Sequence, residues 1–339
     1  MQGMQGMQGT QRLKSRLDGS FYRGAPRWGD TSRCRCLQPK RQTRFSAEDH
    51  RAKSRDALSL VGRIVADRYR LMEVIGKGGH CMVYRGVERA SDAQVAVKVL
   101  LEGLSHHDEL EARLQREYDA LIALTGTSAL RAFGLYREGG AVYLVSEFLR
   151  GQDFDHYLSD VESQGTRIEV STLLEYLDPI VTTLETAHDK GILHRDLKPG
   201  NIFVLGRGTE GGVRLLDFGL SWSEASRPIT RDGMIIGSPS YIAPEVWEGN
   251  PRGLDLRIDV YSLGAIIFRA LAGSVPFPTK SVREKAEAAK SAERPSLHAL
   301  RPDLPPSVDQ WVRQALAADR AHRFSRVRAM WNALRAILT

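Results

Sequence analysis

The sequence is poor in cysteine and has no long apolar run, and both absences limit what the protein can be. Its 339 residues include three cysteines, Cys34, Cys36 and Cys81. These are too few for a disulfide framework in a chain of this length, so we expect a reducing compartment. Apolar residues never continue for the roughly 18 positions of a membrane helix, and the polar N-terminus does not resemble a signal peptide. We therefore expect a cytoplasmic protein without a transmembrane segment.

The excess of positive charge is confined to the start of the chain. The formal net charge is +7, yet residues 1–60 contain 13 Lys and Arg against 5 Asp and Glu, whereas the rest contains 35 against 36. This segment opens with MQGMQGMQG and shows neither helical nor strand periodicity, so we expect residues 1–60 to be a disordered basic extension. Binding of nucleic acid or another acidic surface is an alternative that the lack of regularly spaced aromatic residues disfavours.

Residues 69–148 have the pattern of a small β-rich lobe with one helix. Runs of strand length, rich in Val, Ile and Tyr, occur in YRLMEVIG, MVYRGVE and AQVAVKVLL, and two more occur near ALRAFGLY and AVYLVSEF. Between the third and fourth runs, apolar residues recur at helical spacing in HHDELEARLQREYDALIAL.

Residues 149–339 are mainly helical in pattern. STLLEYLDPIVTTLETAHDK is amphipathic and is followed by Gly191, whereas IDVYSLGAIIFRALAG is apolar on nearly all sides, as a buried helix is. The sequence therefore predicts an α+β fold with a small antiparallel β lobe and a larger helical lobe, within one domain spanning residues 61–339. A cleft between two lobes is a common ligand site.

The small lobe contains two features suited to a nucleotide. IGKGGHCMVY places Gly76, Gly78 and Gly79 between two predicted strands, where bare backbone N–H groups can approach phosphate oxygens. Taken alone, this stretch is weak evidence for a nucleotide site, because glycine clusters between strands are more often hairpin turns. VAVK then places Lys98 in an apolar strand, where it needs a carboxylate partner, and Glu117 on the following helix is positioned to be one.

Two loops in the helical half supply the other groups that phosphoryl transfer requires. HRDLKPGN, residues 194–201, lies between the apolar runs GIL and IFVL, so we expect it in a cleft. There Asp196 can accept a hydroxyl proton, Lys198 can neutralise phosphate charge, and Asn201 can offer its amide oxygen to a metal. A predicted hairpin then leads to LLDFG, where Asp217 is a second metal ligand.

Together these motifs resemble the eukaryotic-type (Hanks-type) serine/threonine protein kinases found in bacteria. The resemblance covers roughly residues 69–338: VAVK resembles the family's VAIK, HRDLKPGN its catalytic loop, DFG its metal loop, and GSPSYIAPE its GTPxYxAPE segment. With the glycine-rich loop, five motifs occur in the family's order. The resemblance implies a bilobal kinase fold and an enzyme that uses ATP and Mg²⁺ to phosphorylate Ser and Thr hydroxyls of proteins, including its own.

The resemblance also implies a role for each site residue. The catalytic set is a phosphate-binding lysine, its carboxylate partner, a base and a lysine on the γ-phosphate: Lys98, Glu117, Asp196 and Lys198. Magnesium is assigned to Asn201 and Asp217. Nucleotide contacts are assigned to the glycine-rich loop, the adenine pocket, the gatekeeper Ser146 and the hinge: Ile75, Gly76, Lys77, Gly78, Gly79, Cys81, Val83, Ala96, Lys98, Ser146, Glu147, Leu149, Phe203 and Asp217.

Further implied roles concern packing and access. A gatekeeper as small as Ser146 should open a pocket behind the adenine. Glu245 should pair with Arg323, and Asp259 should brace the catalytic loop.

Cys81 departs from the family pattern, which has a third glycine at this place. Because cysteine is small, we expect weakened rather than abolished nucleotide binding. A thiol there is either a tolerated substitute or a group that ATP shields and that is open to oxidation when ATP is absent. A pseudokinase, which binds nucleotide and partners without catalysis, is the alternative that Cys81 favours.

Asp232 stands where kinases of this kind often carry a second activation-loop threonine after Thr230. It either imitates a phosphothreonine by facing Arg195, or is a turn residue before Gly233.

If it imitates a phosphate, Asp232→Ala should lower the activity of phosphatase-treated enzyme several-fold, measured as incorporation of labelled phosphate. Unchanged activity would leave the turn interpretation.

Overall fold

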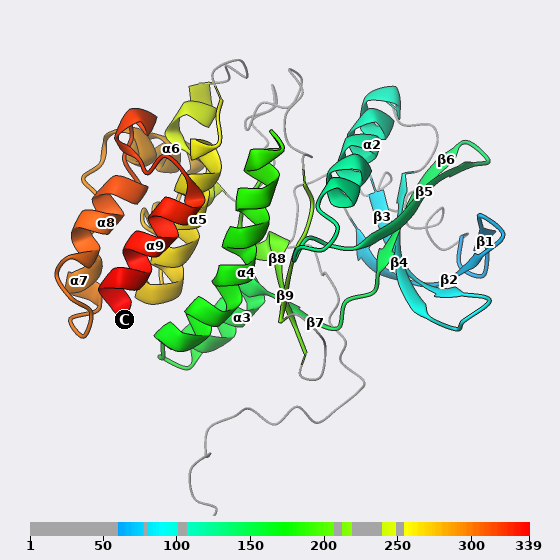
Figure 1. Ribbon diagram of the computed structural model, residues 1–339, viewed down its shortest axis with the longest axis horizontal. Helices are drawn as coiled ribbons and strands as arrows, with labels where there is room; N and C mark the ends of the chain where they lie inside the picture. The colour runs from blue at the N-terminus through cyan, green and yellow to red at the C-terminus, as the bar shows by residue number, and fades with distance from the viewer. Residues whose placement is uncertain (1–59, 78–80, 101–106, 207–211, 219–238, 249–253) are drawn as a thin grey trace, which may run out of the picture. The chain divides into compact units, whose positions relative to one another are not determined.

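The structure is a computed structural model that describes residues 60–77, 81–100, 107–206, 212–218, 239–248 and 254–339 (Figure 1). All of these lie in one compact unit of the chain, Arg35–Thr339. Of the predicted basic extension, only Leu60 is described. Gly78 and Gly79 of the glycine-rich loop, and Thr230 and Asp232, also lie outside the described residues.

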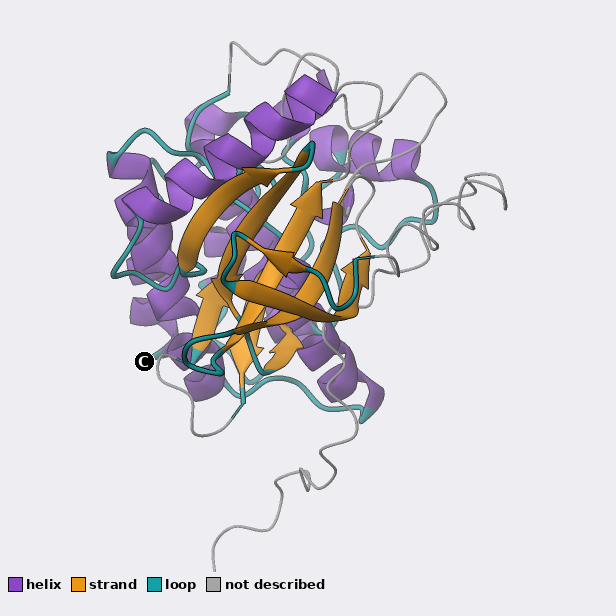
Figure 2. Cartoon of the chain, turned by 90° about the vertical axis from the view of Figure 1, so that its right-hand side faces the viewer, coloured by secondary structure: helices purple, strands orange, loops and turns teal. Residues whose placement is uncertain are grey.

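Six antiparallel strands form the first sheet, in the order β1-β2-β3-β4-β6-β5. Figure 2 draws the strands in orange and the helices in purple. They are β1 (Ile64–Val65), β2 (Tyr69–Lys77), β3 (Cys81–Glu88), β4 (Gln94–Leu100), β5 (Ala132–Glu138) and β6 (Ala141–Glu147). The five strands predicted from the sequence are confirmed. The two-residue β1 was not predicted, because so short a segment shows no alternation.

Helix α2 (His107–Ala123) packs against β5 and β6. Leu100, Val142 and Leu144 of the sheet join Leu114 and Leu121 of this helix in a core that continues into the helical lobe. A second core belongs to the first sheet and the segment before it: Leu60, Val65, Tyr69, Leu71, Met82, Tyr84, Val95, Val97, Val99, Ala141, Tyr143 and Val145. Buried apolar residues of the sheet therefore belong to two cores, and one of these continues into the helical lobe.

The helical lobe is built around α4 (Val170–Asp189) and α5 (Arg257–Ala272). Nearly every residue of α5 is buried, as its apolar sequence predicts. Around them lie α3 (Phe154–Ser163), α6 (Val282–Ser291), α7 (Leu297–Leu300), α8 (Val308–Ala315) and α9 (Val327–Leu338), with the 3-10 turns η1 (Pro199–Asn201), η2 (Pro239–Tyr241), η3 (Pro244–Glu248) and η5 (Arg320–His322). Within the described ranges, none of the helices has the length and apolar content needed to cross a membrane.

A second, three-stranded sheet positions the two polar loops. Its antiparallel strands are β7 (Gly151–Asp153), β8 (Ile202–Leu205) and β9 (Val213–Leu215). The β8–β9 hairpin was predicted from the sequence and is confirmed. The backbone N–H of Leu216 donates to the carbonyl of Asn201 at 2.8 Å, so the loops before β8 and after β9 are held side by side.

A buried ion pair ties η3 to the segment before α9, as predicted. The Arg323 side chain is fully buried, and its two terminal nitrogens donate to the carboxylate oxygens of Glu245 at 2.8 and 2.7 Å. The guanidinium also donates to three backbone carbonyls, of Arg257, Ala317 and Ala318. This arrangement fixes the position of η3 against α5.

Removing Glu245 should leave the Arg323 charge buried with only carbonyl acceptors. We expect Glu245→Ala to lower the free energy of unfolding by about 3–5 kcal/mol, measured by chemical denaturation. Glu248→Ala is the matched control, because Glu248 lies on the same turn but its side chain is 63% exposed and 3.8 Å from Lys290. Equal effects of the two substitutions would contradict the assigned role of the pair.

Candidate active site

Lys98 joins three elements at the boundary between the lobes. Its Nζ donates to both carboxylate oxygens of Glu117 at 2.9 Å and to Oδ1 of Asp217 at 3.0 Å. Lys98 lies on β4, Glu117 on α2, and Asp217 just after β9. The pairing of Lys98 with Glu117 was predicted and is confirmed, whereas the contact with Asp217 was not predicted.

The charges of this cluster are unequally buried. Burial raises the pKa of Glu117, whose side chain is 1% exposed, to about 7 even though Lys98 opposes the shift. Burial also opposes the charge on Lys98, but the carboxylates of Asp217 and Glu117 outweigh it and raise the lysine pKa. For Asp217, burial is outweighed chiefly by Lys98, and the pKa is lowered. Lys98 and Asp217 are therefore charged at neutral pH, and Glu117 is the group that titrates.

The catalytic-loop candidates Asp196, Lys198 and Asn201 contact one another. Lys198 Nζ donates to Oδ2 of Asp196. The amide nitrogen of Asn201 donates to the backbone carbonyl of Asp196 at 2.8 Å and to its Oδ2 at 3.3 Å. Because the nitrogen is used in this way, the amide oxygen of Asn201 is the atom left for a metal. The Asp196 side chain is 27% exposed, so a substrate hydroxyl can reach it.

Asp259 of α5 holds this loop from below, as predicted. Its fully buried carboxylate accepts the backbone N–H groups of His194 and Arg195, both at 2.9 Å. It also lies 2.8 Å from Nε2 of His188. Burial opposes ionisation of Asp259, but the contacts with His188 and with the His194 backbone outweigh it and lower its pKa. The loop is thus anchored by an ionised carboxylate.

His194 connects the two polar loops. Its Nε2 lies 3.0 Å from the carbonyl of Leu216, which can only accept, so Nε2 carries the proton. Its ring packs on Phe218 with 4.9 Å between centroids. Burial lowers the pKa of His194, so the ring is neutral. The residues beside this contact, Arg195 and Asp217, have φ of +65° and +55°, a conformation that costs non-glycine residues of order 1–3 kcal/mol.

The nucleotide-binding candidates of the sheet share one face. Val83 of β3 lies opposite Lys98 of β4, and Ala96 of β4 lies opposite Ser146 of β6. Partners directly opposite each other point to the same side of a sheet, and so do Ala96 and Lys98, two residues apart. Ile75, Gly76 and Lys77 end β2, and Phe203 is buried in β8.

The carboxylate and the backbone N–H of the hinge candidate Glu147 form hydrogen bonds within the protein. Its carboxylate accepts from the backbone N–H of Arg131 at 2.9 Å and from Nε of Arg214 at 2.8 Å. Its own N–H donates to the Arg131 carbonyl. The side chain and the N–H are therefore engaged in structure, which leaves the carbonyl oxygen of Glu147 for an adenine. Leu149 follows β6 and is partly exposed.

Cys81, the departure in the glycine-rich loop, begins β3 and is partly buried. Burial raises the pKa of its thiol and outweighs the opposite effect of Lys98. The thiol is therefore protonated at neutral pH and lacks the activation of a redox-sensitive cysteine. These properties favour the interpretation of Cys81 as a small substitute for glycine.

The donor set around Asp217 and Asn201 fits magnesium. Both offer hard oxygen atoms, and Mg²⁺ is commonly held by one or two protein groups together with phosphate oxygens. Within the described part of the chain, no group of three His, Cys, Asp or Glu side chains gathers to hold a metal on its own.

Two polar residues that were assigned no role from the sequence form hydrogen bonds near this site. His188 contacts Asp259, and Arg269 of α5 donates to Glu162 at 2.9 Å and to the hydroxyl of Tyr241 at 3.0 Å. Arg269 could have been noticed as a charge within an otherwise apolar helix, which must find partners when buried. Its partners could not, because they lie more than 20 residues away in the chain.

Comparison with known proteins agrees with this geometry. The family model described as "Protein kinase domain" matches residues 69–334. The chain is 30% identical to Serine/threonine-protein kinase PrkC of Bacillus subtilis and covers 40% of it. It is 32% identical to Serine/threonine-protein kinase Pkn1 of Myxococcus xanthus and covers 38%. These alignments include 78% and 80% of this chain, which spans well under half of either relative.

The fold has a solved counterpart. A crystal structure of the kinase domain of PknI from Mycobacterium tuberculosis superposes with a TM-score of 0.62 at 26% identity. The alignment covers 82% of this chain and 98% of that domain.

The raised pKa of Glu117 makes folding pH-dependent. The folded protein should bind a proton at Glu117 that the unfolded chain, with the usual value of 4.5, has released. The free energy of unfolding should therefore fall as pH rises between these two pKa values, by at most about 1.4 kcal/mol per pH unit. Glu117→Gln removes this proton, so its stability relative to wild type should improve with rising pH in denaturation experiments.

Glu111→Gln is the control, since Glu111 lies on the same helix and pairs with Arg137 at the surface. Parallel stability curves for wild type and Glu117→Gln across this pH range would show that burial does not perturb Glu117.

Proposed function

This chain belongs to the protein kinase family, and we propose that it is an active serine/threonine protein kinase. It transfers the γ-phosphate of ATP to Ser and Thr hydroxyls of proteins, including its own. The observation that carries the proposal is the pair of contacts made by Lys98, which bring a phosphate-binding lysine, its carboxylate and a metal-binding aspartate together at the lobe boundary. The acceptor class is supported by the DLKPGN sequence and by the names of the relatives.

In the proposed reaction, the nucleotide lies against the sheet face of Val83, Ala96 and Ser146. The carbonyl of Glu147 and the backbone of Leu149 contact the adenine, and Phe203 closes the pocket on the opposite side. Ile75, Gly76, Lys77, Gly78, Gly79 and Cys81 cover the phosphates. Lys98 binds the α- and β-phosphates, and Glu117 keeps its ammonium in place.

The acceptor hydroxyl approaches Asp196, which takes its proton as the bond to phosphorus forms. Lys198, already bonded to Asp196, lies where it can neutralise charge that develops on the transferred phosphoryl group. Asn201 and Asp217 would hold Mg²⁺, which would neutralise charge on the phosphate oxygens. Oδ1 of Asp217 accepts from Lys98 in the structure, so a bound Mg²⁺ would compete with Lys98 for this carboxylate.

The cellular setting follows from the same proposal. We place the kinase in the cytoplasm, with the basic residues 1–60 as an extension outside the catalytic domain. A pocket behind the gatekeeper Ser146, which is 6% exposed, remains a prediction for nucleotide analogues with a bulky group at that position.

Transfer of labelled phosphate from ATP to the chain itself tests the proposal. Asp196→Ala should reduce the rate by about 10²–10⁴-fold, the usual range for loss of a general base. Lys98→Met should also abolish most transfer, since the phosphates lose their cation. Asp189→Ala is the matched control, because Asp189 ends α4 near the same loop but is exposed and paired with Arg326.

A pseudokinase would give a different pattern. Nucleotide would still raise the melting temperature of the wild type, but transfer would not differ between wild type and Asp196→Ala. That result would overturn the enzymatic proposal.

A further inference from the structure

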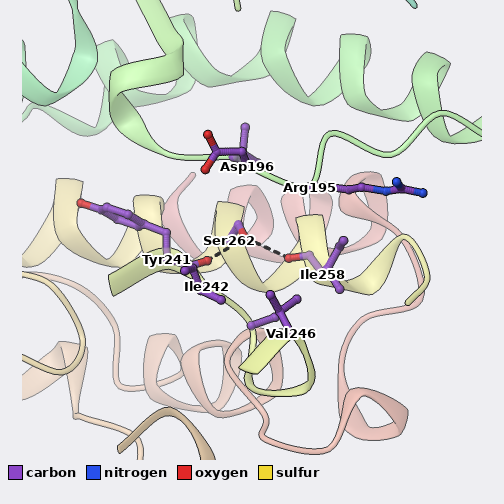
Figure 3. A pocket seen from close by; sticks show the side chains of 9 residues that line it. Arg195, Asp196, Tyr241, Ile242, Val246, Ile258 and Ser262 are labelled. Carbon is purple, nitrogen blue, oxygen red and sulfur yellow. Dashed lines mark hydrogen bonds between the residues drawn. The ribbon is translucent and has the colours of Figure 1, made fainter. Parts of the chain in front are cut away.

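Lys285 of α6 is bonded to the segment next to Asp196, and among the described residues no carboxylate pairs with it. A small cavity of about 20 Å³ is lined by Asp196 and by residues of η2 and the turn after it, including Tyr241 and Ile242 (Figure 3). Ser262 of α5 donates to the Tyr241 carbonyl at 2.7 Å and fixes that turn. Immediately before Tyr241, the hydroxyl of Ser240 accepts from Nζ of Lys285 at 2.8 Å.

Lys285 is partly buried on α6, the helix that packs on η2 and η3. Its hydrogen-bond partner Ser240 is neutral. Burial lowers the pKa of the Lys285 amine, and no carboxylate of the described residues offsets that effect. A partly buried cation whose hydrogen-bond partner is a neutral hydroxyl is incompletely neutralised by the described residues.

The acidic residues near Lys285 are engaged elsewhere. Glu284 closes the capping box of α6, since its carboxylate accepts the backbone N–H groups of Ser281 and Lys280. Glu248 lies 3.8 Å from Lys290. Glu287 is two positions from Lys285, which places it about 200° around the helix. The helix neighbours one turn away from Lys285 are Val282, Ser281, Ala288 and Ala289, none of them acidic.

We propose that Lys285 is a specificity-determining residue that binds an anionic side chain of the protein substrate beside η2, the turn whose Tyr241 lines the same cavity as Asp196. The proposal rests on the proposed kinase function and names the substrate class that this site selects. Charge complementarity identifies the occupant. An anion takes the place of water next to the Lys285 ammonium, and Ser240 provides a second hydrogen-bonding group. The shared chemistry is a carboxylate or a phosphate on the peptide.

Steady-state kinetics with synthetic peptides test the inference. Each peptide has one threonine acceptor, and glutamate, glutamine or phosphoserine is placed at one flanking position at a time. At one of these positions, the wild type should have a KM about tenfold lower for the glutamate peptide than for the glutamine peptide, as a charged hydrogen bond of about 1.4 kcal/mol predicts. A larger gain for phosphoserine than for glutamate would identify phosphate as the preferred anion.

Variants of Lys285 assign the effect to this side chain. Lys285→Ala should lose the discrimination while keeping kcat for the glutamine peptide, Lys285→Arg should keep it, and Lys285→Glu should favour a lysine-bearing peptide. Arg283→Ala is the matched control, because Arg283 is exposed on the same helix about 200° from Lys285.

Two outcomes would overturn the inference: a wild type that does not distinguish the peptides, or a Lys285→Ala variant that distinguishes them as well as the wild type. Both differ from failure of the kinase proposal, in which the wild type phosphorylates neither a peptide nor itself.

Discussion

The sharing of one buried ammonium between two carboxylates from different lobes is the constraint on which the candidate site depends. Lys98 and Glu117 belong to the small lobe, and Asp217 follows a strand of the large lobe. If all three groups are ionised, the cluster carries one negative charge in excess. Burial makes this charge unfavourable and raises the pKa of Glu117. A divalent cation that draws Asp217 away would leave a balanced lysine–glutamate pair. The excess negative charge of the cluster is therefore electrostatically compatible with a divalent cation beside Asp217.

A second constraint acts on the catalytic loop from the interior. Asp259 offers a buried carboxylate to two consecutive backbone N–H groups, and His194 links the same loop to the carbonyl of Leu216. The strained backbone at Arg195 and Asp217 lies beside these bonds. Such strain persists where the surrounding contacts over-determine the conformation. The backbone next to Asp196 and at Asp217 is thus held by these connections, in addition to the contacts of the two side chains. Transfer chemistry requires such precise positions.

The sequence predicts the parts of this site that are encoded locally. Alternation of valines in β4 places Lys98 on the less buried face, and helical spacing places Glu117 on the following helix, so their pairing could be foreseen. The resemblance to kinases likewise anticipates the links of Asp259 and of Glu245 with Arg323. The second partner of Lys98 could not be read from the sequence, because it depends on how the lobes meet. The same holds for Arg269, whose partners lie on α3 and η2, and for Lys285, whose bond to Ser240 depends on how α6 packs.

The central claim is that these groups form a working phosphotransferase for Ser and Thr. Phosphoamino-acid analysis of the wild-type chain after incubation with labelled MgATP tests it most directly, with Asp196→Ala as the background. We expect labelled phosphoserine or phosphothreonine in the wild type and almost none in the variant. Label confined to phosphotyrosine, or equal label in both proteins, would contradict it.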